Sequence, residues 1–298
     1  MPNQPKSPPS NFRILLVWLA MGLALCGSVS ASDFQTQLEW LPKGHSFPIR
    51  YLDPQACQQT IQALSYEVEG DSQQRLYVPI SLSMRQQFLR YAFTAEKHFE
   101  LGLAFSIFNQ FSIIDAGEAF MGGLQNADYR VSAVAVYTQD PSTHYRMSLF
   151  HQSSHLGDDY IIRNEITTAT LRTLNYEQLD LTLSKSWGAY RGYLGLGYNV
   201  SPHTVRGRGT FQIGADLTNP IQSNPGIAFK AAFDSKWHEQ LDYSPNLRIG
   251  MGLELARQTQ TPFIVMLTWY SGHLPYSTLE YQKVKLMGLS LFIDLDRS

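Results

Sequence analysis

Hydrophobic and polar residues alternate with a period of two over much of the chain. Between residues 99 and 107, one face carries the apolar side chains Phe99, Leu101, Leu103, Phe105 and Ile107, and the other face carries small or polar ones. The same pattern returns in the ranges 179–183, 211–217, 247–255, 263–269 and 287–295. Alternating segments of about ten residues with small or polar inner faces are typical of transmembrane strands. We therefore predict an all-β fold, a transmembrane antiparallel β-barrel of about 12 strands.

A soluble β-sandwich also alternates and is the main alternative for the fold. The strand length and the small or polar inner faces disfavour it. Aromatic residues near the predicted strand ends, among them Tyr137, Trp187, Tyr198 and Trp237, suit the interfacial girdles of a barrel. Only 16% of the residues are charged, against roughly 25% in ordinary soluble domains. The formal net charge of −2 leaves no basic surface for nucleic acid.

The start of the chain has the pattern of a targeting segment. Lys6 and Arg13 precede the apolar run ILLVWLAMGLALC, and Val29 and Ala31 occupy the small-residue cleavage positions. We predict a cleaved signal peptide over residues 1–31 and a location in the bacterial outer membrane. An uncleaved anchor helix and a lipoprotein are the alternatives.

The remaining chain is predicted to have two parts. Residues 32–85 are expected to form an N-terminal periplasmic segment or the first strands, and residues 86–298 the barrel. No stretch after the signal approaches the roughly 18 apolar residues that a spanning helix needs. Cleavage would leave Cys57 as the one cysteine, so no intramolecular disulfide is expected.

Reactive side chains concentrate in the stretch FHQSSHLGDDY, residues 150–160. Alternation places His151 and Ser153 on the same face as the apolar residues before them, which is the predicted lipid face. Polar groups at membrane depth are costly unless they are paired, so these two residues are functional candidates. A turn at Gly157 would return the chain as a hairpin and bring Glu165 or Asn164 near His151. A serine beside an imidazole that a third group orients is the minimal nucleophilic triad.

This arrangement resembles two families of lipid hydrolases. A His-x-Ser pair on one barrel strand, with a third residue fourteen positions after the histidine, is similar to outer-membrane phospholipase A and to the lipid A 3-O-deacylases. The resemblance implies that His151 is the base, Ser153 the nucleophile and Glu165 the orienting residue, with Asn164 as the alternative third member. The implied substrate is an acyl ester of phospholipid or lipid A. The position of Asp158 resembles that of a calcium-binding acidic residue of the phospholipase, which makes calcium the implied cofactor.

A second resemblance covers more of the chain. The stretch HQSSHLGDDY, with LDP at residues 52–54 and WYSGHLPY at residues 269–276, resembles a family of uncharacterised bacterial outer-membrane proteins with an HQSSHLGDE-like signature. That resemblance implies a barrel in the outer membrane and assigns no activity.

Two other interpretations of the stretch stay open. In the first, residues 151–159 only order a hairpin of a structural barrel or a narrow channel. In the second, the imidazole and carboxylate groups of His151, His155, Asp158 and Asp159 hold a metal ion. The oligomeric state, including a homodimer, also stays open, and the turn is assigned to the extracellular end by analogy with the lipid hydrolases.

Inward-facing arginines are expected to be structural. Arg146, Arg163 and Arg248 fall on predicted inner faces, where they are expected to pair with Glu100, Asp180 or Glu254 inside the barrel.

Overall fold

The computed structural model describes residues 37–70, 75–115, 120–167, 173–201, 206–259, 261–293 and 295. The predicted signal peptide, residues 1–31, lies outside this part of the chain. Within it, no helix is long and apolar enough to cross a bilayer.

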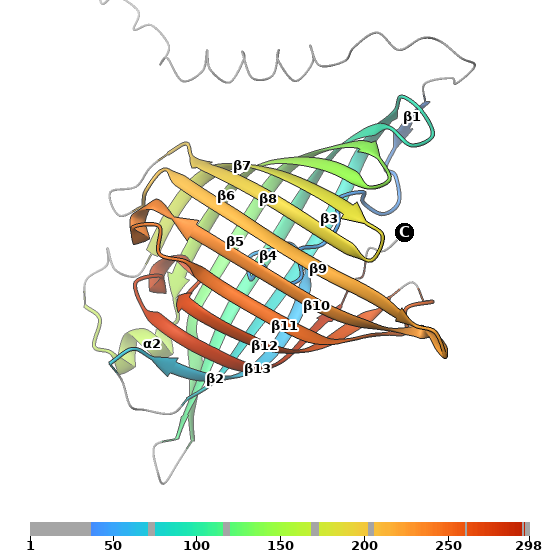
Figure 1. The fold of residues 1–298 in the computed structure, drawn as a ribbon. Coiled ribbons are helices and arrows are strands. Elements are labelled where there is room, and N and C mark those ends of the chain that lie inside the picture. The colour runs from blue at the N-terminus through green and yellow to red at the C-terminus, as the bar shows by residue number, and fades with distance from the viewer. Residues whose placement is uncertain are drawn as a thin grey trace, which may run out of the picture. The chain divides into compact units, whose positions relative to one another are not determined.

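The strands form a closed antiparallel barrel of 12 strands, with a further short strand paired beside it (Figure 1). The ring closes because β2 pairs with β3 on one side and with β13 on the other. The short strand β1 pairs with the end of β3. The strands are β1 (Gln37–Trp40), β2 (Gln59–Val68), β3 (Arg75–Ala92), β4 (His98–Asp115), β5 (Phe120–Asp140), β6 (Thr143–Leu156), β7 (Thr173–Trp187), β8 (Tyr190–Asn199), β9 (Gly209–Ile221), β10 (Asn224–His238), β11 (Asn246–Leu255), β12 (Phe263–His273) and β13 (Lys283–Ile293).

The alternation in the sequence becomes two different surfaces of the barrel wall. Large apolar side chains point outward and stay exposed, as Leu149 (43%), Leu181 (47%) and Leu289 (59%) do. Polar side chains such as Gln110 and Gln152 point inward and are fully buried. An apolar outer band around a polar interior is the arrangement that lipid requires of a spanning barrel. The predicted fold class is confirmed.

The two ends of the barrel differ in their connections. At one end, which we call the short-turn end, two residues join neighbouring strands at 141–142, 188–189 and 222–223. At the opposite end, the long-loop end, the connections at 157–172, 200–208 and 274–282 are longer. They carry helix α2 (Asp158–Arg163) and the 3₁₀ helix η3 (Ser277–Leu279). A further 3₁₀ helix, η2 (Glu239–Leu241), follows β10 at this end.

Residues 43–58, which we call the inner segment, run inside the barrel between β1 and β2. The carbonyl oxygen of Gln55 accepts a hydrogen bond from Arg130 of β5 (3.1 Å), and that of Ile49 accepts one from Arg191 of β8. Asp53 forms an ion pair with Lys236 of β10 (2.9 Å). Strands from different sides of the wall therefore hold the segment, which occupies part of the lumen.

The structure moves the expected start of the barrel. Of the two roles expected for residues 32–85, residues 59–68 and 75–85 take that of first strands, because they form β2 and part of β3. The boundary predicted at residue 86 falls inside β3. Alternation in this region is real but short, because β2 has only 10 residues and follows directly on the irregular inner segment.

Candidate functional site

Strand β6 presents the predicted site on the outer wall near the long-loop end. Along the strand, the side chains of His151, Ser153 and His155 point outward, whereas those of Gln152 and Ser154 are fully buried in the lumen. The apolar part of the same outer face ends at Leu149. The three polar residues therefore form a row at the margin of the apolar band, and we call it the outer-wall row.

A carboxylate from the next strand orients His151. Glu177 of β7 lies directly across from His151 in the register of the two strands, and its Oε1 accepts a hydrogen bond from the histidine Nδ1 at 2.8 Å. Both side chains are partly exposed, at 51% and 40%. With the proton fixed on Nδ1, the Nε2 of the neutral ring is left as the basic nitrogen.

The hydroxyl of Ser153 lies beside the other imidazole of the row. Its Oγ is 2.6 Å from the Nε2 of His155, and the ring of His155 meets Tyr129 of β5 edge to face, with 6.2 Å between centroids. Ser153 therefore has one histidine two positions before it and one two positions after it on the same face. The structure brings the serine together with His155 and the carboxylate together with His151.

The predicted third member, Glu165, does not approach His151. The chain does not return as a hairpin after Gly157 but forms α2, and β7 begins only at Thr173. Glu165 and Asn164 lie just after the helix with exposed side chains, and the amide of Asn164 donates to the carbonyl of Tyr160 (2.8 Å). Acidic residues in the first turn of the helix and Arg163 in its last turn suit the helix dipole.

Position 157, at the start of this helix, requires glycine because the backbone of β5 passes very close to it. A Cβ on Gly157 would lie 2.1 Å from the carbonyl oxygen of Leu124 on β5, so no other residue fits there without a backbone shift. Asp159 secures the same contact, because its carboxylate accepts a hydrogen bond from the amide of Leu124 (3.1 Å).

The proposed metal ligands do not converge. His155 contacts Ser153, Asp159 binds the backbone of β5, and Asp158 is exposed at the start of α2. Among the described residues, no three histidine, cysteine or acidic side chains lie close enough to hold an ion. The arrangement does not fit the calcium that the phospholipase resemblance implies, and we derive no chemical step through a metal.

A buried polar network lies directly behind the outer-wall row. Asp128 of β5 is fully buried, and its carboxylate accepts from Ser154 Oγ (2.5 Å), from Gln152 Nε2 (2.7 Å) and from Asn126 Nδ2 (2.6 Å). It also accepts from the backbone amide of Ser277 in η3 at 3.3 Å. The lumenal side chains that alternate with the row are thus held in place.

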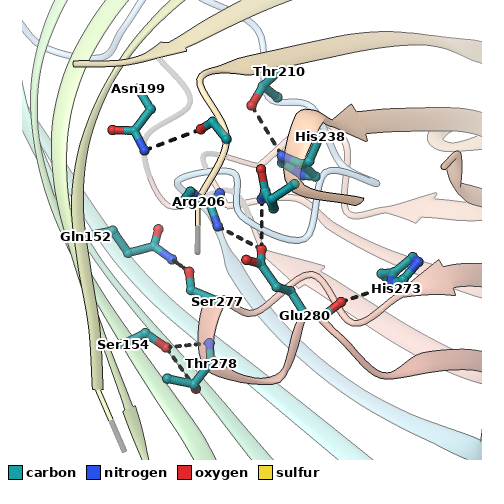
Figure 2. A network of polar contacts seen from close by, with 12 residues as sticks. Gln152, Ser154, Asn199, Arg206, Thr210, His238, His273, Ser277, Thr278 and Glu280 are labelled. Atoms are coloured by element: carbon teal, nitrogen blue, oxygen red, sulfur yellow. Dashed lines mark hydrogen bonds and ion pairs between the residues drawn. The ribbon is translucent and has the colours of Figure 1, made fainter. Parts of the chain in front are cut away.

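The connection between β12 and β13 closes onto this network (Figure 2). Gln152 also donates to Ser277 Oγ (2.7 Å), and the amide of Thr278 donates to Ser154 Oγ (3.2 Å). Glu280 pairs with Arg206 of the β8–β9 loop at 2.7 Å. Burial alone would lower the pKa of Arg206, but the neighbouring Tyr176 and Glu280 raise it above its ordinary value, so the guanidinium stays charged. The loops at this end are locked to each other and to β6.

Two members of the site were within reach of the sequence pattern. Leu179, Leu181 and Leu183 share an outer face, and extending their alternation two residues back places Glu177 on that face. Extending the outward face of β6 by two residues likewise includes His155. Asp128 gave no comparable signal, because its importance comes from partners that lie on three different elements.

Comparisons with known proteins agree with the barrel fold. A family model described as a protein of unknown function, DUF1207, matches residues 24–294. The chain belongs to this family. A comparison with curated proteins gives no match.

Among solved structures, the chain is similar to outer membrane phospholipase A from Escherichia coli. The identity is 10%, the TM-score is 0.53, and the match covers 80% of this chain and 90% of the phospholipase. It is also similar to the outer membrane phospholipase dimer with bound calcium from Salmonella typhi, at 10% identity and a TM-score of 0.50, over 78% of this chain and 90% of that one. These similarities place this DUF1207 chain among outer-membrane-type barrels and concern the fold alone.

Proposed function

We propose that this chain is a serine acyl-ester hydrolase that acts on lipid at the barrel's outer wall, with Ser153 as nucleophile, His151 as base and Glu177 as the residue that orients the base. The observation that carries the proposal is the 2.8 Å contact between His151 and Glu177 beside an outward-facing serine. The fold similarity to a phospholipase and the resemblance of the His-x-Ser motif support the same class of substrate.

The position of the row suits a lipid substrate. Short turns face the periplasm and long loops face the outside in outer-membrane barrels, so the long-loop end of β6 lies at the outer leaflet. A lipid that packs its acyl chains along Leu149 and Met147 would bring its ester group to the level of the row. The substrate is then phospholipid or lipid A of the outer leaflet, reached from within the membrane.

The chemistry requires only a rotation of one side chain. Side chains two positions apart on one strand face are separated by roughly 6.6 Å along the strand, so Ser153 is equally placed for His151 and His155. When its hydroxyl turns to His151, the Nε2 takes the proton as Oγ attacks the ester carbonyl. The proton then passes to the leaving alcohol, and water releases the acyl group by the same route. Glu177 stabilises the imidazolium that forms.

The assay that tests the activity is acyl release by the purified chain in mixed micelles that contain either phospholipid or lipid A. Release from one of the two substrates identifies the lipid. The proposal fails if neither substrate loses acyl chains at a rate above that of protein-free micelles.

Replacing Glu177 tests the orienting carboxylate. We expect Glu177→Gln to lower the rate of acyl release on the order of 100-fold, because the imidazole loses the charge that stabilises its protonated form. Glu165→Gln is the matched control, since this exposed carboxylate lies at the same end and touches no member of the row. Equal losses in the two variants, or a loss in Glu165→Gln alone, would contradict the assignment of Glu177.

The same assay distinguishes the roles of the two histidines. His151→Asn is expected to remove nearly all activity, whereas His155→Asn keeps most of it, because His155 only holds the resting hydroxyl. The reverse result would make His155 the base and leave Glu177 without a catalytic partner.

A further inference from the structure

The barrel interior holds a cavity near the short-turn end. A cavity with about 510 Å³ of empty space, part of it open to solvent, lies between the inner segment and the walls of β3, β4, β5 and β6. Arg146 is the fourth residue of β6, which begins at this end, so the cavity lies far from the outer-wall row. None of the residues proposed for acyl hydrolysis lines it.

The cavity is lined by positive charge. Arg50, Arg85 and Arg146 contribute to its wall, and no aspartate or glutamate does among the described residues that line it. Arg50 is neutralised by Asp53 at 3.1 Å. Arg146 forms no ion pair and no hydrogen bond with any described residue; its guanidinium lies 5.9 Å from the ring centroid of Phe47. The charge of Arg146 is therefore not directly paired with a described carboxylate, although the charge of Asp180 acts on it from a distance.

The nearest acidic neighbour of Arg146 on β7 is engaged elsewhere. Asp180 lines a different cavity, where its carboxylate accepts a hydrogen bond from Gln178 Nε2 at 2.6 Å. The expectation that inner-face arginines pair with carboxylates therefore holds neither for Arg146 nor for Arg248, whose recorded partner is Gln62. Arg163 lies on α2 instead of an inner face.

His45 adds an acceptor to this cationic wall. Its Nδ1 lies 3.0 Å from the carbonyl oxygen of Phe47, which can only accept, so Nδ1 carries the proton. Burial, and after it the charge of Arg85, lowers the pKa of His45 to about 3, so the ring is neutral at pH 7. Its Nε2 is then a buried acceptor, and it has no hydrogen-bond partner in the described part of the chain.

We infer that this cavity binds hydrogen phosphate, with its oxyanion on the guanidinium of Arg146 and its P–OH donated to the Nε2 of His45. Planar guanidinium groups bind phosphate oxygens well. The neutral imidazole selects an anion that still carries a proton. Hydrogen phosphate keeps a P–OH at neutral pH, whereas sulfate and the phosphodiesters of lipid headgroups keep none.

Calorimetric titration of the full-length chain in an uncharged detergent, at pH 7 and constant ionic strength, tests the inference. Inorganic phosphate should bind saturably, and sulfate at least about ten-fold more weakly, because a site built to accept a hydroxyl proton rejects an analogue that lacks it. Sulfate binding as tightly as phosphate, or no saturable phosphate binding, overturns the inference.

Variants test the roles of the Arg146 guanidinium and the His45 imidazole separately. We expect Arg146→Gln to weaken phosphate binding at least about ten-fold, and Arg208→Gln, whose guanidinium contacts Tyr198 at 2.5 Å on the exposed rim, to leave it unchanged. His45→Ala should instead bring the phosphate and sulfate affinities together. Equal affinities in Arg146→Gln and Arg208→Gln would place the anion elsewhere. If Arg146→Gln fails to show the heat-dependent gel shift of a folded barrel, the comparison of phosphate with sulfate in His45→Ala decides instead.

Discussion

Replacing Ser153 with alanine is expected to abolish acyl release, with a fall of at least about 1,000-fold in kcat/KM on whichever lipid the unchanged chain hydrolyses. The loss follows from the absence of any other nucleophile in the outer-wall row, since histidine and glutamate there serve as base and orienting group. Removing the nucleophile of a serine triad leaves only the stabilisation that binding supplies, which is small beside covalent catalysis.

The matched control is Ser65→Ala. Ser65 is an exposed serine on the outer wall of β2, where its hydroxyl donates to the carbonyl of Met287 at 3.1 Å. Its loss removes a hydroxyl of the same kind at a distance from the row and should leave the rate unchanged. A Ser153→Ala chain as active as Ser65→Ala would transfer the activity to other residues and leave β6 with a structural role.

The inner segment bears on the choice between the proposed hydrolase and the channel. A channel requires continuous water through the lumen, whereas residues 43–58 cross it and bind the wall through Arg130, Arg191 and Lys236. This packing fills part of the lumen and therefore favours the structural interpretation over the channel. The acyl-release assay decides between that interpretation and the hydrolase.

The wall of the barrel was predictable because alternation is a local property. Each outward residue of β6 follows from its neighbours two positions away, so the outer position of His151 and Ser153 could be read directly from the sequence. The same alternation predicts that Glu177 faces outward, but it does not predict that Glu177 contacts His151. Pairing across strands depends on the length of the loop between them, and the loop after Gly157 contains a helix.

The filled lumen could not be predicted in the same way. The inner segment has no period, and its role depends on Asp53 meeting Lys236, 183 residues later in the chain. The unpaired charge of Arg146 is hidden for a related reason: alternation shows that it faces inward but not which carboxylates are already engaged. Long-range polar contacts carry both features, and periodicity contains no information about them.

Asp128→Ala is expected to be the most damaging change to the stability of the long-loop end. Three side chains and the amide of Ser277 donate to this carboxylate, all in a region without solvent. Alanine would leave several buried donors without an acceptor, at about 1–3 kcal/mol for each that finds no substitute. We expect the free energy of unfolding, measured by denaturant titration in lipid vesicles, to fall by about 3–5 kcal/mol.

Asp158→Ala is the control that separates this network from a general effect of removing a carboxylate. Asp158 is exposed in the first turn of α2, so its loss should cost about 0.3–1 kcal/mol through the helix dipole. Asp128→Asn keeps the shape and one acceptor oxygen, and should fold while lowering acyl release, because residues 152 and 154 set the positions of the three outward residues between and beside them. Equal destabilisation by Asp128→Ala and Asp158→Ala would show that the network does not hold β6. Full activity in Asp128→Asn would show that the geometry of the row does not depend on the lumenal carboxylate.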